Sequence, residues 1–121
     1  MQLEIADHFQ LLALHRCLLE AKFSEDPNDK DIAGSPLVAD LARRVVRKLE
    51  EHPEAGDWES WLRLDPSRRE WKIALDTAVK DKAYWGDLGM TAREAYVEDL
   101  LAPFRLSSDS RDDFMSAAGM T

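Results

Sequence analysis

Glu4, His8 and His15, near the start of the chain, have side chains that commonly bind metal ions. Their spacing places all three along one narrow stripe of an ideal helix. His8 and His15 are two turns apart, so a shared ion would need further ligands from another helix, such as residues 50–52. The stripe is a candidate metal site, and the alternative is that it forms the polar edge of a buried helix.

Two groups of cationic side chains are candidates for anion or partner binding. The groups comprise Arg43, Arg44, Arg47 and Lys48, and Arg68, Arg69 and Lys72. In the first, Arg43 and Arg47 form a candidate anion site, to which Arg68 and Arg69 of the second group could contribute, although cations also stabilise the end of a helix that carries them. Arg68 and Arg69 stand at an expected helix start, where acidic residues are favoured, and this conflict suggests a role in partner binding.

Residues 29–40 match a calcium-binding loop only in part, because the fifth position is Ala33 and the twelfth is the shorter Asp40. We expect a solvated linker there. Cys17 stands among leucines and is expected to be a buried, inert thiol. The sequence contains no catalytic triad order, nucleophile elbow or phosphate-binding glycine loop, so we predict no catalytic residue and no cofactor.

All four tryptophans of the chain fall between residues 58 and 85. Trp71 and Trp85 share one helical stripe with Leu75 and Ala78, which predicts that they belong to the core. Trp58 and Trp61 belong to a short segment with polar residues between them, and interfaces are enriched in tryptophan. Trp58 and Trp61, together with Arg68 and Arg69, are therefore the predicted partner-binding residues.

The elements that must position these side chains are helices, since no segment shows the alternation of a strand. The expected helices cover residues 2–23, 35–52, 57–64, 66–85 and 91–102, with an acidic loop at 24–34 and a short terminal helix or frayed tail at 107–121. Ser35, Asp57 and Asp65 are the expected caps of three of them, and Thr91 opens a capping box. The segment 2–23 is apolar on two faces, which is typical of a central helix. We predict an all-α fold in which residues 1–121 form a single-domain compact bundle of five main helices around a central first helix.

Composition narrows the function. The chain has 121 residues, one cysteine and a net charge of −8, which disfavours nucleic acid as a partner and suits a reducing cytoplasm. No membrane span or secretory signal is expected. The first hypothesis is a non-enzymatic cytoplasmic module that binds a protein partner, as an adaptor, a regulator or an immunity-type binder. Self-association as a homodimer, through the second apolar face of residues 2–23, belongs to this hypothesis. The alternative is a metal- or small-ligand-binding bundle that uses Glu4, His8 and His15.

Overall fold

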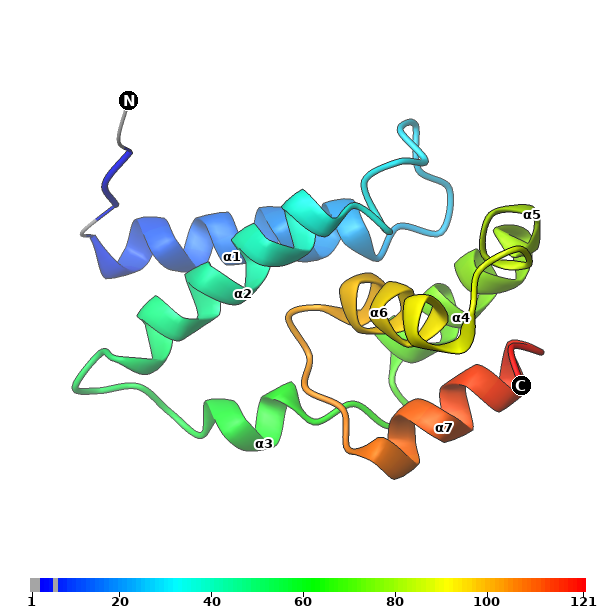
Figure 1. Cartoon of the computed structure of the whole chain (residues 1–121). Helices are drawn as coiled ribbons and strands as arrows, with labels where there is room; N and C mark the ends of the chain where they lie inside the picture. Colours follow the sequence, from blue (N-terminus) through cyan, green and yellow to red (C-terminus); the bar gives the residue numbers. More distant parts are fainter. Residues whose placement is uncertain (1–2, 6) are drawn as a thin grey trace.

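A computed structural model describes residues 3–5 and 7–121, and in this part of the chain all regular structure is helical (Figure 1). The helices are α1 (His8–Lys22), α2 (Pro36–Glu50), α3 (Trp58–Leu62), α4 (Arg69–Lys80), α5 (Lys82–Trp85), α6 (Met90–Leu101) and α7 (Ser108–Ala117). Five of the seven have at least seven residues. The prediction of an all-α, compact single domain is confirmed.

Local capping explains where several helices begin. The Ser35 hydroxyl accepts the N–H of Val38, and Pro36 occupies the first turn of α2 as the sequence predicts. The Asp57 carboxylate caps α3 in the same way. The predicted cap at Asp65 is wrong, because its carboxylate binds Ser67 in a turn and α4 begins only at Arg69. The predicted capping box at Thr91 is also wrong, since α6 begins at Met90 without a side-chain cap.

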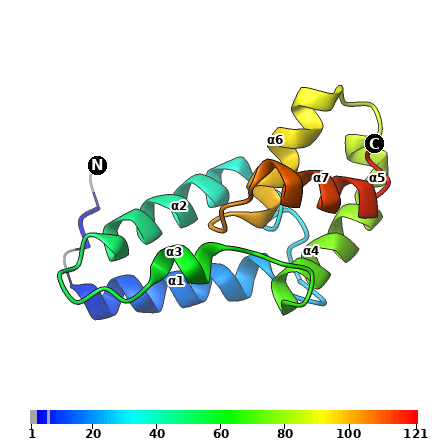
Figure 2. The ribbon, with the colours of Figure 1, turned by 90° about the horizontal axis from the view of Figure 1, so that it is seen from below.

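The first helix is shorter than predicted and is not central. Asp7 accepts the N–H groups of Phe9 and Gln10, so α1 begins at His8. The helix packs mainly against α2, and α3 crosses beneath the pair, as Figure 2 shows from below. Its opposite side faces solvent, and the Phe9 side chain is 78% exposed. The expected central helix is therefore an edge helix.

Only the later part of the polar stripe points inward: Glu4 is exposed and His8 is half-buried, whereas His15 and Lys22, which extends the stripe by two turns, are buried. His15 is 6% exposed and Lys22 is 2% exposed, and both lie between the two apolar sides of the helix. On one side, Leu14 and Leu18 pack on a small cluster of Leu11, Val45 and Leu49 between α1 and α2. Apolar side chains therefore flank the buried His15 and Lys22 on both sides, and this explains why the helix is apolar on two faces.

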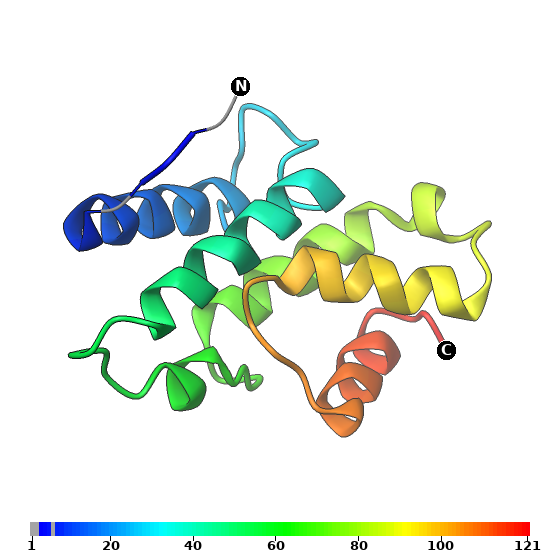
Figure 3. The same ribbon diagram turned by 60° about the vertical axis from the view of Figure 1, so that its left-hand side comes forward.

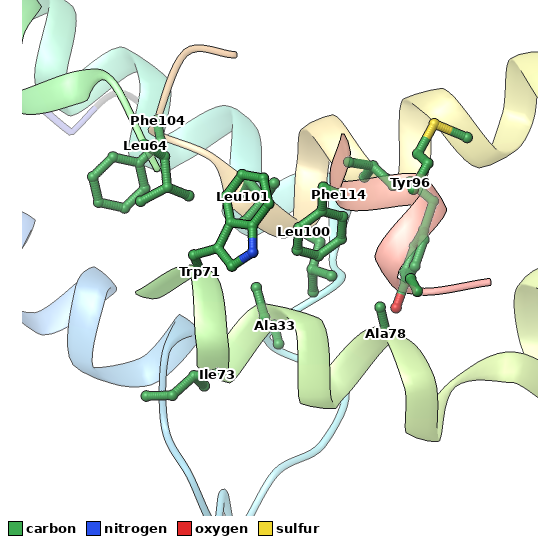
Figure 4. Close-up of a cluster of buried hydrophobic side chains, with 14 of the residues drawn as sticks. Ala33, Leu64, Trp71, Ile73, Ala78, Tyr96, Leu100, Leu101, Phe104 and Phe114 are labelled. Carbon is green, nitrogen blue, oxygen red and sulfur yellow. The ribbon is translucent and has the colours of Figure 1, made fainter. Parts of the chain in front are cut away.

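The main core lies between α4, α6 and α7, and Figure 3 shows α4 and α6 side by side with α7 beneath them. Trp71 is buried with its ring against Phe114, and the Trp85 indole N–H donates to the Ala78 carbonyl over 2.7 Å. Figure 4 shows Trp71 among Leu100, Leu101 and Phe114. The prediction that Trp71 and Trp85 belong to the core is confirmed.

The predicted helix over residues 66–85 is interrupted at Asp81, which separates α4 from α5. The Tyr96 hydroxyl donates a hydrogen bond of 2.7 Å to the Asp81 carboxylate and so links this break to α6. A contact between residues distant in sequence therefore stabilises an interruption that the helical pattern does not indicate. Burial, together with Asp81, raises the pKa of the Tyr96 hydroxyl far above its ordinary range.

The end of the chain is packed, so the alternative of a frayed tail is wrong and the terminal helix is present as α7. Phe114, Met115 and Met120 are fully buried. The Arg93 guanidinium donates to the Met120 carbonyl over 2.9 Å. It also donates to three carbonyls in the turn between α5 and α6, those of Trp85, Gly86 and Leu88. One arginine therefore holds that turn and the chain end together.

Candidate interaction surface

The predicted partner-binding tryptophans face the inside of the molecule more than solvent. Trp58 and Trp61 are both half-buried and meet edge to face, with ring centroids 5.6 Å apart. The His15 ring lies 5.3 Å from Trp58 and 5.1 Å from Trp61, and Trp61 packs on Phe104 at 4.9 Å. These contacts hold α3 against α1. The two indoles therefore stabilise the fold, and only part of the surface of each remains accessible.

Arg68 and Arg69 also bind within the chain. The Arg68 guanidinium donates to the carbonyl oxygens of Trp61 and Arg63, over 2.5 and 3.0 Å. It lies over the Trp61 and Phe104 rings, in a cation–π arrangement at 5.2 and 4.7 Å. Arg69 donates to the Phe23 carbonyl. The unusual cations at this helix start therefore have internal partners, which resolves the conflict seen in the sequence.

Arg43 and Arg47 are not brought together with Arg68 and Arg69 as an anion site. The Arg43 guanidinium binds the Asp99 carboxylate and the Glu98 carbonyl, each over 3.0 Å, and so links α2 to α6. Arg47 is exposed on the outer side of α2. Arg43, Arg68 and Arg69 thus bind different groups within the chain, and Arg47 is exposed to solvent.

The hypothetical metal ligands Glu4, His8 and His15 do not converge. His8 stacks on His52 with ring centroids 3.9 Å apart, whereas His15 lies between the tryptophans. Imidazole lone pairs lie in the ring plane, so two stacked rings do not aim at one ion. Among residues 3–5 and 7–121, no group of three or more His, Cys, Asp or Glu side chains is placed to hold a metal. Burial, and secondarily Arg16, lowers the pKa of His15.

The partial calcium loop has other contacts. Asp29 accepts the N–H of Asp31, Ala33 is buried, and Asp40 lies 3.9 Å from Arg44 on α2. Asp29 and Asp31 are exposed. The interpretation of residues 24–34 as an acidic surface loop agrees with this exposure.

Lys22 is a buried charged side chain, and its sequence position alone did not indicate a special role. Its ammonium donates to the Ala33 carbonyl over 2.9 Å and to the Asp99 carbonyl over 2.8 Å. Burial lowers its pKa to about 8, while Asp99 acts in the opposite direction and Arg43 in the same one. The lysine therefore clasps the loop before α2 to the last turn of α6, where a cation is favoured. Its place in a narrow polar stripe between two apolar faces was the available signal.

Cys17 is exposed, so the prediction of a buried thiol is wrong. It lies on the outward side of α1, where Ala13 and Phe9 precede it at intervals of one turn. Neighbouring leucines in the sequence point elsewhere, because successive residues of a helix face different directions.

Two apolar side chains on successive turns of α2 are exposed. Leu37 is 83% exposed, and Leu41, one turn later, is 41% exposed. Arg44 and Lys48 continue the same line along the helix, and both are exposed. We call Leu37, Leu41, Arg44 and Lys48 the α2 ridge. Leu37 and Leu41 belong to the apolar pattern of α2 but lie at its edge, away from the buried Ala42, Val46 and Leu49, and this offset was the sequence signal for their exposure.

A groove of about 290 Å³ lies between α3 and the start of α7. It is lined by Glu59, Arg63, Leu64, Arg105, Leu106, Ser107 and Ser110. The Arg63 guanidinium lies 3.7 Å from Glu59, and the Arg105 guanidinium binds both carboxylate oxygens of Glu50. Because each arginine has an acidic partner, the groove is close to neutral and is a poor anion site.

The fold and the surface together define an all-α protein with an apolar and basic ridge on one outer helix. In the part of the chain that the structure covers, no helix is long and apolar enough to cross a membrane. Comparison of the chain with protein-family models, with curated proteins and with solved structures gave no match.

Proposed function

We propose that this protein is a cytoplasmic helical module that binds another protein through the α2 ridge, as an adaptor, a regulator or an immunity-type binder. The observation that carries the proposal is the exposure of Leu37 and Leu41 side by side on α2. Exposed leucines that form part of a continuous surface commonly mark binding sites, because covering them in a complex is favourable.

The neighbourhood of the ridge supports the proposal. Leu14 and Leu18 on α1, which runs antiparallel to α2 and packs against it (Figure 1), are half-buried and keep part of their apolar surface accessible. The other side of this helix pair is covered by α3. A partner seated on the ridge would cover the exposed side of α2, whose other sides pack against α1 and α6.

The exposed Cys17 suits a reducing compartment, where a lone surface thiol stays reduced. Trp58 and Trp61 are secondary candidates for contact with a partner, because each keeps part of its surface accessible.

A pull-down from cells of the source organism tests the proposal. The bait with Leu37→Ser and Leu41→Ser should lose a partner that the wild-type bait retains. Val79→Ser is the matched control, because Val79 is 53% exposed on α4, away from the ridge. A partner retained equally by all three baits contradicts the assignment of the ridge.

A further inference from the structure

The α2 ridge combines two chemistries that a single occupant must match. Leu37 and Leu41 need an apolar surface, and Arg44 and Lys48, further along the same line, need anions. In a chain of net charge −8, the segment 36–50 is unusual because it carries four cations against two acids. The occupant should therefore present leucine-like side chains followed by acidic ones.

We propose that this occupant is a second copy of the same chain, bound with the two α2 helices antiparallel about a two-fold axis that passes between Leu37 and Leu41 on the exposed side of α2. This proposal rests on the proposed function, since it names the partner of the same ridge. In such a pair, Leu37 of one copy packs against Leu41 of the other, and each contact occurs twice. The apolar part of the ridge is thus complementary to itself.

The antiparallel arrangement also places acidic side chains opposite the basic part of the ridge. Arg44 and Lys48 extend past the point where the second copy's α2 begins, and the residues that precede α2 form the loop 24–34. That loop carries four acids and one lysine, and Figure 1 shows it projecting beside the start of α2. Its acids Glu25, Asp29 and Asp31 are exposed. Charge complementarity therefore favours a second copy as the occupant.

The existing ion pairs of the ridge do not compete strongly with this contact. Arg44 lies 3.9 Å from Asp40 and Lys48 lies 3.6 Å from Glu51, and all four side chains are well exposed. Exposed pairs of this kind contribute about 0–1 kcal/mol each. One ridge and one loop from each copy form a small interface, so we expect a dissociation constant of roughly 1–100 µM.

Sedimentation velocity from about 1 µM to about 300 µM tests the dimer. The wild-type chain should change from monomer to dimer over this range. Leu37→Ser with Leu41→Ser should remain monomeric, and the control Val79→Ser should dimerise normally. Far-UV circular dichroism identifies any variant that fails to fold.

Charge exchange tests the orientation. Arg44→Glu with Lys48→Glu places acids opposite the acidic loop, and Asp29→Lys with Asp31→Lys places cations opposite the basic ridge. For each double variant alone, the dissociation constant of the dimer should rise at least tenfold. An equal mixture of the two should form a mixed dimer, because both sets of ridge-to-loop contacts are then attractive. Failure of the mixture to associate overturns the antiparallel arrangement.

Two other outcomes separate this proposal from the proposed function. A wild-type chain that stays monomeric at the highest concentration overturns the second copy as occupant, whereas loss of a different protein from the ridge variant in the pull-down keeps the ridge as a binding surface. A dimer unaffected by the leucine substitutions overturns the proposal, because it must use another face.

Discussion

The Lys22 ammonium, in the last turn of α1, donates a hydrogen bond of 2.8 Å to the main-chain carbonyl of Asp99, near the end of α6. The same ammonium reaches the Ala33 carbonyl, so one charged group joins three segments. Since burial lowers the pKa of Lys22 to about 8, this clasp should have a measurable dependence on pH.

Stability should rise with pH above the pKa of Lys22. Between pH 8 and the ordinary lysine value of 10.5, the unfolded chain binds a proton that the folded chain has released, so the free energy of unfolding increases. From pH 8 to about pH 9.5 the gain is about 1–2 kcal/mol, because the folded lysine is still half protonated at pH 8. Urea unfolding of wild type and Lys22→Met should show this slope only in the wild type. The exposed Lys30→Met is the control and should keep it.

His15 should make the fold sensitive to acid. Its pKa is lowered in the folded state, mainly by burial, so below its ordinary value of 6.5 the unfolded chain takes up a proton that the folded chain resists. Stability should therefore fall as the pH drops below that value. His15→Phe should reduce the loss measured by urea unfolding at about pH 7.5 and about pH 5, and an undiminished loss would contradict the assignment to His15. His8→Phe serves as the comparison and should retain the loss.

Trp61→Ala should destabilise the protein more than Trp58→Ala. Trp61 contacts Phe104, His15 and the Arg68 guanidinium, whereas Trp58 contacts fewer aromatic groups. We expect a loss of about 3 kcal/mol for Trp61→Ala and about 1–2 kcal/mol for Trp58→Ala. Chemical denaturation measures both, and two near-neutral substitutions would show that the indoles are free for a partner.

Arg93→Met should weaken the end of the molecule opposite α3. The substitution keeps the apolar stem but removes donors to four carbonyls, so the expected loss is about 2–4 kcal/mol. Hydrogen exchange should accelerate around Leu88 and Met120. Arg44→Met, on the exposed ridge, is the matched control and should change stability by less than about 0.5 kcal/mol.

The Cys17 thiol should react in the native state. It is exposed on the outward side of α1, so a disulfide reagent that releases a coloured thiolate should modify one thiol per chain without denaturant. Cys17→Ser should release none. A thiol that reacts only in urea would mean that this side of α1 is covered.

Local signals in the sequence predicted much of the fold. Ser35 and Asp57 cap helices as expected, because a cap depends on hydrogen bonds between residues two or three apart. The break at Asp81 was not predictable, since it depends on the Tyr96 hydroxyl from another helix. The same limit applies to Lys22, whose carbonyl partners lie 11 and 77 residues away in the sequence.

The candidate surface was predictable only in part. The sequence correctly set Trp71 and Trp85 apart from Trp58 and Trp61, because the first two follow a regular stripe. It did not show that Trp58 and Trp61 pack on His15, since that contact joins α3 to α1. Leu37 and Leu41 lie at the edge of the apolar pattern of α2, and how far that edge is exposed depends on the neighbouring helices, which apolar periodicity does not reveal.

The burial of Met120 and its link to Arg93 also bear on how the protein is made. The core of α4, α6 and α7 needs Phe114, Met115 and Met120, which are synthesised after every other part of that core. On the ribosome, α1 and α2 can pair early, but the larger core stays open until residue 120 has left the exit tunnel. A nascent chain stalled before that point exposes apolar surface, which makes it a substrate for chaperones.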